Sequence, residues 1–159
     1  MKLTKSSLKK LCLKIWSKVI REKENYTCQW CYKKSISNHA HHIVSRGLGN
    51  ILSPFDIRNG QTLCYRCHMF RLKADVDSYV EFRDKWLAKR GLNYNDMRAE
   101  LTKLTYGVTL DDYLVIYDKL KNELKKIEEA KDEDSTFQED KLPILQVSKK
   151  ASRPKQNKL

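Results

Sequence analysis

Two Cys-x-x-Cys pairs constrain this chain more than any other feature of its sequence. They are Cys28–Cys31 and Cys64–Cys67, and the fifth cysteine, Cys12, stands apart from them. A two-residue gap lets a tight turn aim both sulfurs at one ion, and two such turns complete a closed, tetrahedral thiolate site for structural Zn²⁺. Disulfide pairing is the less favoured alternative in an intracellular chain. The pairs therefore predict a small region that folds by binding zinc.

Basic side chains are concentrated in the first part of the chain. The 159 residues have a net charge of +12, and residues 1–90 alone carry 19 basic and 7 acidic side chains, which also gives +12. This excess favours a polyanion such as DNA as the partner, although solubility alone could explain it. No apolar run approaches the roughly 18 residues of a membrane-spanning helix, and the N-terminus has no signal-peptide core. We therefore expect a cytoplasmic protein with no membrane partner.

Hydrophobic periodicity predicts a mainly helical α+β chain in four parts. They are an N-terminal basic helix in residues 1–24, a small ββα core with its zinc in 25–75, a helical region in 76–130, and a disordered charged tail in 131–159. Within these parts we expect strands at 40–44 and 61–63 and helices at 8–20, 65–73, 78–89, 95–104 and 110–130.

Several residues are expected to end the helices or to face the core. The expected helix-capping residues are Ser6 or Ser7, Asp77, Asn93 or Asn95, and Thr109 with Asp112, while Gly91 ends a helix. The residues expected to face the core from the first helix are Leu8, Leu11, Ile15 and Val19, with Cys12 in ordinary packing. Those expected on the last helix are Leu110, Tyr113 or Leu114, Tyr117, Leu120, Leu124 and Ile127.

All four histidines lie in one short window around the cysteine pairs. His39, His41 and His42 precede the second pair, and His68 follows it directly. Four sulfurs already saturate a tetrahedral ion, so the surplus imidazoles predict a second metal site or a proton-transfer site rather than further zinc ligands. On a strand, His41 and His42 point to opposite faces and can therefore serve different roles.

These residues together resemble the HNH endonuclease motif with its zinc-binding cysteine pairs. The resemblance rests on Ala40–Ile43, on Asn59 five positions before Cys64, and on His68 directly after the second pair. It implies a ββα-metal fold and a metal-dependent endonuclease that hydrolyses DNA phosphodiester bonds and leaves 5′ phosphate and 3′ hydroxyl ends.

The resemblance also implies a role for each residue of the motif. His42 would be the general base, and His41 and His68 would bind one catalytic divalent cation, which could be Mg²⁺, Mn²⁺ or another transition metal. Asn59 would fix the backbone of His42 as a positioning residue of the catalytic site. His39 has no assigned role, and it is either an exposed neighbour of the motif or a third ligand of the catalytic cation.

A weaker similarity extends to the phage NinG/Rap recombination nucleases. It rests on Lys10–Arg21, Ser45–Gly47 and Phe55–Asn59, and on the Tyr-rich helical region after residue 78. That family usually has Gly where this chain has His41 and Asn where it has His68. The similarity implies a role in phage recombination or replication, and hence the cytoplasm of a bacterial host.

Basic side chains near the motif are candidate contacts to DNA phosphates. They are Arg46, Arg66, Arg71 and Lys73. A non-catalytic, zinc-dependent DNA-binding module is the alternative function, but it would leave the histidines and Asn59 without a role. A zinc deaminase is excluded, because the sequence lacks the His-x-Glu and Pro-Cys-x-x-Cys elements of that class.

Overall fold

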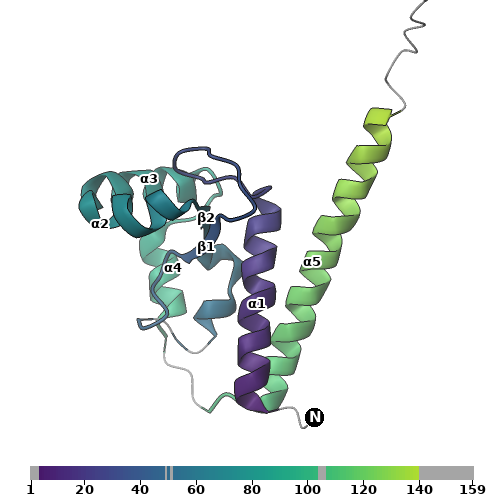
Figure 1. The fold of residues 1–159 in the computed structure, drawn as a ribbon. Helices are drawn as coiled ribbons and strands as arrows, with labels where there is room; N and C mark the ends of the chain where they lie inside the picture. Colours follow the sequence, from purple (N-terminus) through teal and green to yellow (C-terminus); the bar gives the residue numbers. More distant parts are fainter. Residues whose placement is uncertain (1–3, 49, 51, 104–106, 140–159) are drawn as a thin grey trace, which may run out of the picture.

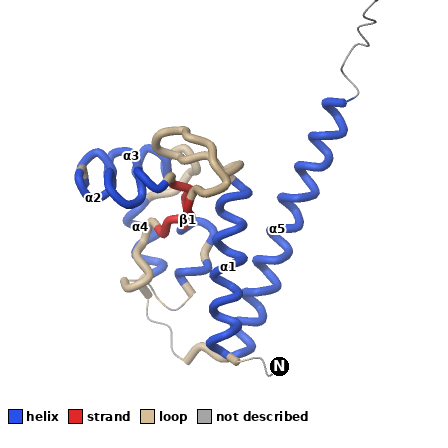
Figure 2. Tube along the Cα trace, viewed as in Figure 1, coloured by secondary structure: helices blue, strands red, loops and turns tan. Residues whose placement is uncertain are grey.

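A computed structural model describes residues 4–48, 50, 52–103 and 107–139 (Figure 1). The main elements are α1 (Lys5–Lys23), β1 (His39–His42), β2 (Gly60–Leu63), α3 (Val76–Ala88), α4 (Tyr94–Leu101) and α5 (Leu110–Glu139). The short helical turns are η1 (Ser53–Phe55), η2 (Ile57–Asn59), η3 (Cys67–Arg71) and α2 (Leu72–Ala74). Figure 2 shows how little of the chain is strand, which confirms the predicted mainly helical α+β class with helices on both sides of a cysteine-bearing hairpin.

Helix α1 begins one turn earlier than predicted, because Thr4 caps it rather than Ser6 or Ser7. The Thr4 hydroxyl accepts a hydrogen bond from the Ser7 N–H at 3.2 Å, and the Ser7 hydroxyl accepts one from the Thr4 N–H at 3.0 Å. This reciprocal pair is a capping box, so Ser7 is the inner partner of the cap and not the cap itself. The predicted 8–20 segment is thus the middle of a longer helix.

The buried face of α1 also differs from the prediction. Its buried residues are Leu8, Cys12, Trp16, Val19 and Ile20. Leu11, which was expected to face the core, is 36% exposed. Spacings of four residues keep side chains on one side of a helix, and the large Trp16 ring selects this stripe because it reaches both α5 and the β-hairpin. The placement of Cys12 in ordinary core packing is confirmed.

Helix α5 lies beside α1 and runs in the same direction (Figure 1). The buried Cys12 thiol donates to the Tyr113 carbonyl at 3.5 Å, and further along Lys18 pairs with Glu128 at 2.8 Å. Thr109 and Asp112 form the predicted capping box, with the Thr109 N–H donating to the Asp112 carboxylate at 2.7 Å.

Helix α5 does not end near residue 130, where the sequence pattern lost its period. It continues to Glu139, so residues 131–139 are helical rather than part of a disordered tail, while residues 140–159 lie outside the described part. No Gly or Pro interrupts the segment, and Lys131 pairs with Glu22 of α1 at 2.6 Å. Leu110, expected in the buried stripe, is 37% exposed because it occupies the first turn, whereas Tyr113 and Leu120 are buried.

Helices α3 and α4 follow the hairpin. Asp75 caps α3 by accepting from the Ser78 N–H at 3.1 Å, so the predicted cap Asp77 lies inside the first turn. Gly91 has a φ of 68°, which confirms the predicted left-handed stop. Asn93 caps α4, which settles the alternative between Asn93 and Asn95.

The two strands pair antiparallel and form the junction of three apolar clusters. His39 lies opposite Leu63 and His42 opposite Gly60, so each strand starts one residue earlier than predicted. One cluster joins α1, η1 and α5, the second joins the end of β1 to α3 and α4, and the third surrounds the cysteine pairs. The hairpin is therefore held from three sides, which fixes the residues that it carries.

Among the described residues, no helix is both long enough and apolar enough to cross a membrane.

Candidate functional site

The β-hairpin gives the adjacent residues His41 and His42 different surroundings. Neighbouring side chains on a strand leave it on opposite faces. His41 accordingly meets α3 through Tyr79, whereas His42 meets α1 through Trp16. The structure thus places two neighbouring imidazoles in two separate environments.

His42 is held in one orientation by an aromatic ring and a carbonyl group. Its ring is stacked on Trp16, with centroids 3.9 Å apart and planes 12° apart. Its Nε2 lies 3.0 Å from the Pro54 carbonyl oxygen. A carbonyl oxygen can only accept, so Nε2 carries the hydrogen and Nδ1 keeps the lone pair. Burial lowers the pKa of His42, the bond to Pro54 opposes this shift, and the charge of Arg46 adds to it.

Asn59 ties the end of β1 to the loop that follows it. Its Oδ1 accepts from the Val44 N–H at 2.6 Å, and its Nδ2 donates to the carbonyls of Val44 and Ser53, each at 3.1 Å. Its own carbonyl accepts from the Ile43 N–H at 3.0 Å. The side chain is fully buried. Asn59 therefore fixes the backbone just after His42 rather than His42 itself, and it also fixes the segment next to Pro54.

His41 is half-buried and hydrogen-bonded. Its Nε2 lies 3.1 Å from the Tyr79 hydroxyl, which also receives a bond from the Gln61 amide at 3.0 Å. Burial lowers the pKa of His41 to about 3, and the nearby His68 and His42 add to the shift. A neutral imidazole is the form that binds a metal ion, so His41 is kept in the form that a ligand requires.

His68 and His39 lie near His41 and complete a cluster of three imidazoles. The His68 ring is 5.0 Å from that of His41 and 5.5 Å from that of His39, and the two Nδ1 atoms of His68 and His39 are 3.4 Å apart. Burial lowers the pKa of His68, and the charges of His39 and Lys73 lower it further. His39 is exposed, so it is both a surface residue and a neighbour of the predicted ligand pair.

The donor set of this cluster fits a divalent transition-metal ion, because neutral imidazoles suit such ions better than they suit Mg²⁺. The three imidazoles do not form a converged set of ligand atoms: within the part of the chain that is described, the four cysteines are the only group of three or more potential ligands whose donor atoms all lie within 4.8 Å of one another.

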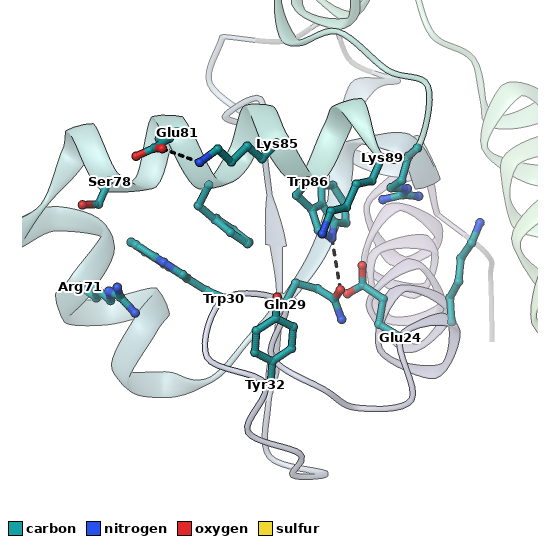
Figure 3. A pocket seen from close by; sticks show the side chains of 13 residues that line it. Glu24, Gln29, Trp30, Tyr32, Arg71, Ser78, Glu81, Lys85, Trp86 and Lys89 are labelled. Carbon is teal, nitrogen blue, oxygen red and sulfur yellow. Dashed lines mark hydrogen bonds and ion pairs between the residues drawn. The ribbon is translucent and has the colours of Figure 1, made fainter.

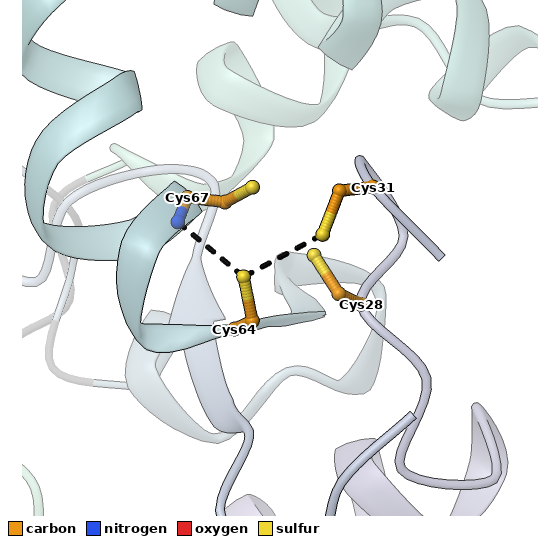
Figure 4. Close-up of side chains that lie close together, drawn as sticks. All are labelled: Cys28, Cys31, Cys64 and Cys67. Atoms are coloured by element: carbon orange, nitrogen blue, oxygen red, sulfur yellow. Dashed lines mark hydrogen bonds between the residues drawn. The ribbon is translucent and has the colours of Figure 1, made fainter. Parts of the chain in front are cut away.

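The four predicted cysteines come together just after the C-terminal end of β2 (Figure 4). The Cys31 and Cys64 sulfurs are 3.6 Å apart, and the Cys67 N–H donates to the Cys64 sulfur at 3.4 Å. Four sulfurs at about 2.3 Å from a tetrahedral Zn²⁺ are roughly 3.8 Å from one another. The cluster, which includes Cys28, is thus consistent with a structural zinc ion.

Backbone hydrogen bonds shape the first cysteine pair. The Cys28 N–H donates to the Lys33 carbonyl at 3.0 Å, and the Tyr32 N–H donates to the Cys28 carbonyl at 2.8 Å. Tyr32 has a left-handed φ of 60°, which closes the turn. Burial raises the pKa of the Cys31 thiol, but the Lys33 N–H and the other thiols outweigh it and bring the pKa down to about 7. This shift favours the thiolate form of Cys31, whereas burial raises the pKa values of Cys28 and Cys67.

The predicted DNA contacts fall into two groups. Arg46 and Lys73 are exposed on the histidine side, where their charges act on the neighbouring imidazoles. Arg66 and Arg71 are exposed beside the cysteine cluster, and the Arg71 guanidinium lies over the Trp30 ring at 4.3 Å from its centroid. The structure therefore does not bring all four cations to one place.

Sequence reasoning missed three partners of the histidines. They are Trp16, Tyr79 and Pro54, and nothing in the sequence connects these residues to His42 or His41. A Trp or Tyr at a core position of a flanking helix was the available signal, and it does not specify which histidine the ring will meet.

A family model described as HNH endonuclease matches residues 28–69. The match is about a quarter of the chain and includes both cysteine pairs, all four histidines and Asn59. Neither the curated proteins nor the solved structures contain a match to this chain. The match suggests nuclease activity, and it leaves the flanking helices α1, α3, α4 and α5 outside the family region.

Proposed function

We propose that this protein is a metal-dependent endonuclease that hydrolyses DNA phosphodiester bonds, with His42 as its general base. The observation that carries this proposal is the arrangement of His42. The Pro54 carbonyl occupies Nε2, and the Trp16 ring supports one face, so the lone pair of Nδ1 is the free basic atom. The match of residues 28–69 to the HNH endonuclease family gives independent support.

Different residues have separate roles in the proposed reaction. His42 takes a proton from water through Nδ1 and so makes the water a better nucleophile toward phosphorus. His41 and His68 hold the ion, and the Tyr79 hydroxyl orients the His41 ring. A divalent cation bound there would supply charge neutralisation at the scissile phosphate and at the leaving 3′ oxygen. Asn59 keeps the backbone after His42 in place, and the cysteine cluster keeps β2 in place.

The charge of the chain supports a nucleic-acid substrate. Arg46 and Lys73 extend from the histidine side as exposed cations, and both are suited to DNA phosphates. The features shared with NinG/Rap nucleases support phage recombination or replication in a bacterial cytoplasm as the biological context. The products would carry 5′ phosphate and 3′ hydroxyl ends, as in the family that the motif resembles.

The test is cleavage of supercoiled plasmid by the zinc-loaded protein with Mg²⁺, Mn²⁺ or Ni²⁺. We compare wild type with His42→Ala and His42→Phe, because Phe keeps an aromatic ring on Trp16 but has no basic nitrogen. Loss of a general base typically reduces the rate about 10²- to 10⁴-fold. Both variants should show this loss while retaining zinc content and circular dichroism spectra like those of wild type.

The same assay separates the two candidate functions. Cleavage by folded, zinc-loaded His42→Phe at the wild-type rate would show that His42 is not the base. Retention of DNA by the wild type with every metal, but with no nicking, would favour the non-catalytic DNA-binding module.

A further inference from the structure

A cleft of about 690 Å³ lies between α3 and the first cysteine pair (Figure 3). Its walls come from the end of α1, from residues 29–32 around the first cysteine pair, and from one side of α3. We call it the aromatic–basic cleft, and the residues that define it are Lys23, Tyr32, Trp30, Trp86, Lys85 and Lys89. Neither the proposed catalysis nor the zinc site uses this cleft.

Aromatic rings line the aromatic–basic cleft. Trp30 is stacked on Phe82 with ring centroids 5.3 Å apart and planes 6° apart, and the Trp86 indole N–H donates to the Gln29 side chain at 3.2 Å. Tyr32 is 74% exposed, and the left-handed turn that closes the cysteine pair holds it at the cleft. A large exposed ring held at the cleft by this turn offers a face for another flat ring.

Positive charge surrounds these rings. Five cations line the cleft against two carboxylates, Glu24 and Glu81. The Arg90 guanidinium lies over the Trp86 ring at 4.4 Å from its centroid, and Lys85 pairs with Glu81 on an exposed surface. Glu24 carries only part of a negative charge near pH 7, because its burial raises its pKa to about 7 despite its bond from Thr62 and the nearby Arg90 and Lys23. The cleft therefore combines stacking surfaces with an excess of cations.

One aromatic ring separates this cleft from the proposed catalytic centre. The Tyr79 ring is 5.7 Å from Trp30 on one side and 5.9 Å from His41 on the other, measured between centroids. A strand that occupied the cleft would therefore pass close to the histidine cluster.

We propose that the aromatic–basic cleft binds unpaired nucleotides of the DNA substrate, with a base stacked on Tyr32 and phosphates on Lys85 and Lys89. This inference rests on the proposed function, because it assumes that the polyanion bound by the cleft is DNA. Bases in a duplex are already stacked on their neighbours, so a cleft of this kind selects strands with exposed bases. The substrate class would be DNA in which a single-stranded segment adjoins the cleavage site.

The test is binding of labelled oligothymidylate, measured by fluorescence anisotropy. All variants carry His42→Ala, which should prevent cleavage of the DNA during the measurement. Removing a stacking ring typically weakens binding roughly 5- to 150-fold per base, so Tyr32→Ala should lower the affinity for oligothymidylate by that factor and change duplex affinity less than about twofold. The double variant Lys85→Glu/Lys89→Glu should weaken binding and flatten its salt dependence. The double variant Lys9→Glu/Lys10→Glu, on the exposed side of α1, is the charge-matched control and should retain binding.

Three results would overturn this inference. One is wild-type affinity of Tyr32→Ala for oligothymidylate, and a second is equal loss in the α1 control and the cleft double variant. Equal dependence of duplex and single-stranded binding on Tyr32 would also contradict stacking of unpaired bases. Failure of the nuclease proposal is distinguishable, since a chain that binds oligothymidylate through the cleft but never nicks DNA would refute only the catalytic function.

Discussion

Replacement of Asn59 tests the way in which the histidine-bearing hairpin is held. The Val44 N–H can only donate, so the atom that faces it at 2.6 Å must be the amide oxygen, and the amide nitrogen must face the two carbonyls of Val44 and Ser53. Asn59→Ala removes all three bonds. Asn59→Asp keeps the acceptor but replaces the donor with a second oxygen that faces two carbonyl oxygens.

The expected magnitude follows from these three bonds. A protein hydrogen bond contributes about 0.5–1.5 kcal/mol net, so Asn59→Ala should lower the free energy of unfolding by about 1.5–4.5 kcal/mol. Asn59→Asp should be pH-dependent. Burial raises the pKa of the new carboxyl above its unfolded value of about 3.9, so the native state is favoured below that value and loses stability as pH rises through the raised pKa.

The assay is urea denaturation at fixed zinc concentration, because bound zinc itself adds to the measured stability. For a slope of about 2 kcal/mol per molar urea, the midpoint of Asn59→Ala should fall by roughly 1–2 M. Asn122 is exposed on α5, so Asn122→Ala and Asn122→Asp are matched controls that should stay within about 0.5 kcal/mol of wild type.

The reasoning is refuted if Asn59→Ala denatures like Asn122→Ala. It is also refuted if Asn59→Asp loses no more stability at pH 8 than at pH 5, because the carboxyl would then not be confined between the carbonyls.

Three further outcomes follow from single side chains. In urea denaturation, Glu24→Gln should stabilise the protein at pH 8 and leave its stability unchanged near pH 4. The reason is that the pKa of Glu24 is raised to about 7, so the native state loses stability as pH rises from the unfolded pKa through pH 7. An equal effect at both pH values would contradict this. Gly60→Ala should cost about 1–3 kcal/mol, since the new Cβ would overlap the Ile20 side chain, and an unchanged urea midpoint would show that the contact relaxes freely. Tyr79→Phe should weaken the binding of Mn²⁺ to zinc-loaded protein about 10- to 100-fold in calorimetry, because it removes the hydroxyl that orients His41. Unchanged Mn²⁺ affinity with an unchanged fold would show that Tyr79 does not orient His41 for metal binding.

Local signals in the sequence predicted the parts of the fold that depend on near neighbours. Gly91 ends a helix through its own backbone freedom, and Asn93 and Thr109 cap helices through bonds that span two or three residues. The end of α5 was predicted wrongly for a related reason. The contact that extends it, between Lys131 and Glu22, joins residues far apart in the chain, and composition cannot reveal such a contact.

The sequence by itself also determined the chemistry of the candidate site. Two cysteine pairs at fixed spacing predicted one four-sulfur cluster, and the strand period predicted that His41 and His42 would have different surroundings. Both predictions depend only on short-range geometry.

The tertiary structure alone decided which side chains surround each histidine and where the aromatic–basic cleft lies. Trp16 reaches His42 from α1, and Tyr79 lies between His41 and Trp30 because α3 packs on the hairpin. Such contacts depend on how helices distant in the chain pack together, and packing depends on the shapes of many side chains at once rather than on any local spacing. The zinc and histidine chemistry can thus be read from the sequence, whereas the tautomer of His42 and the aromatic–basic cleft emerge only when the helices are assembled.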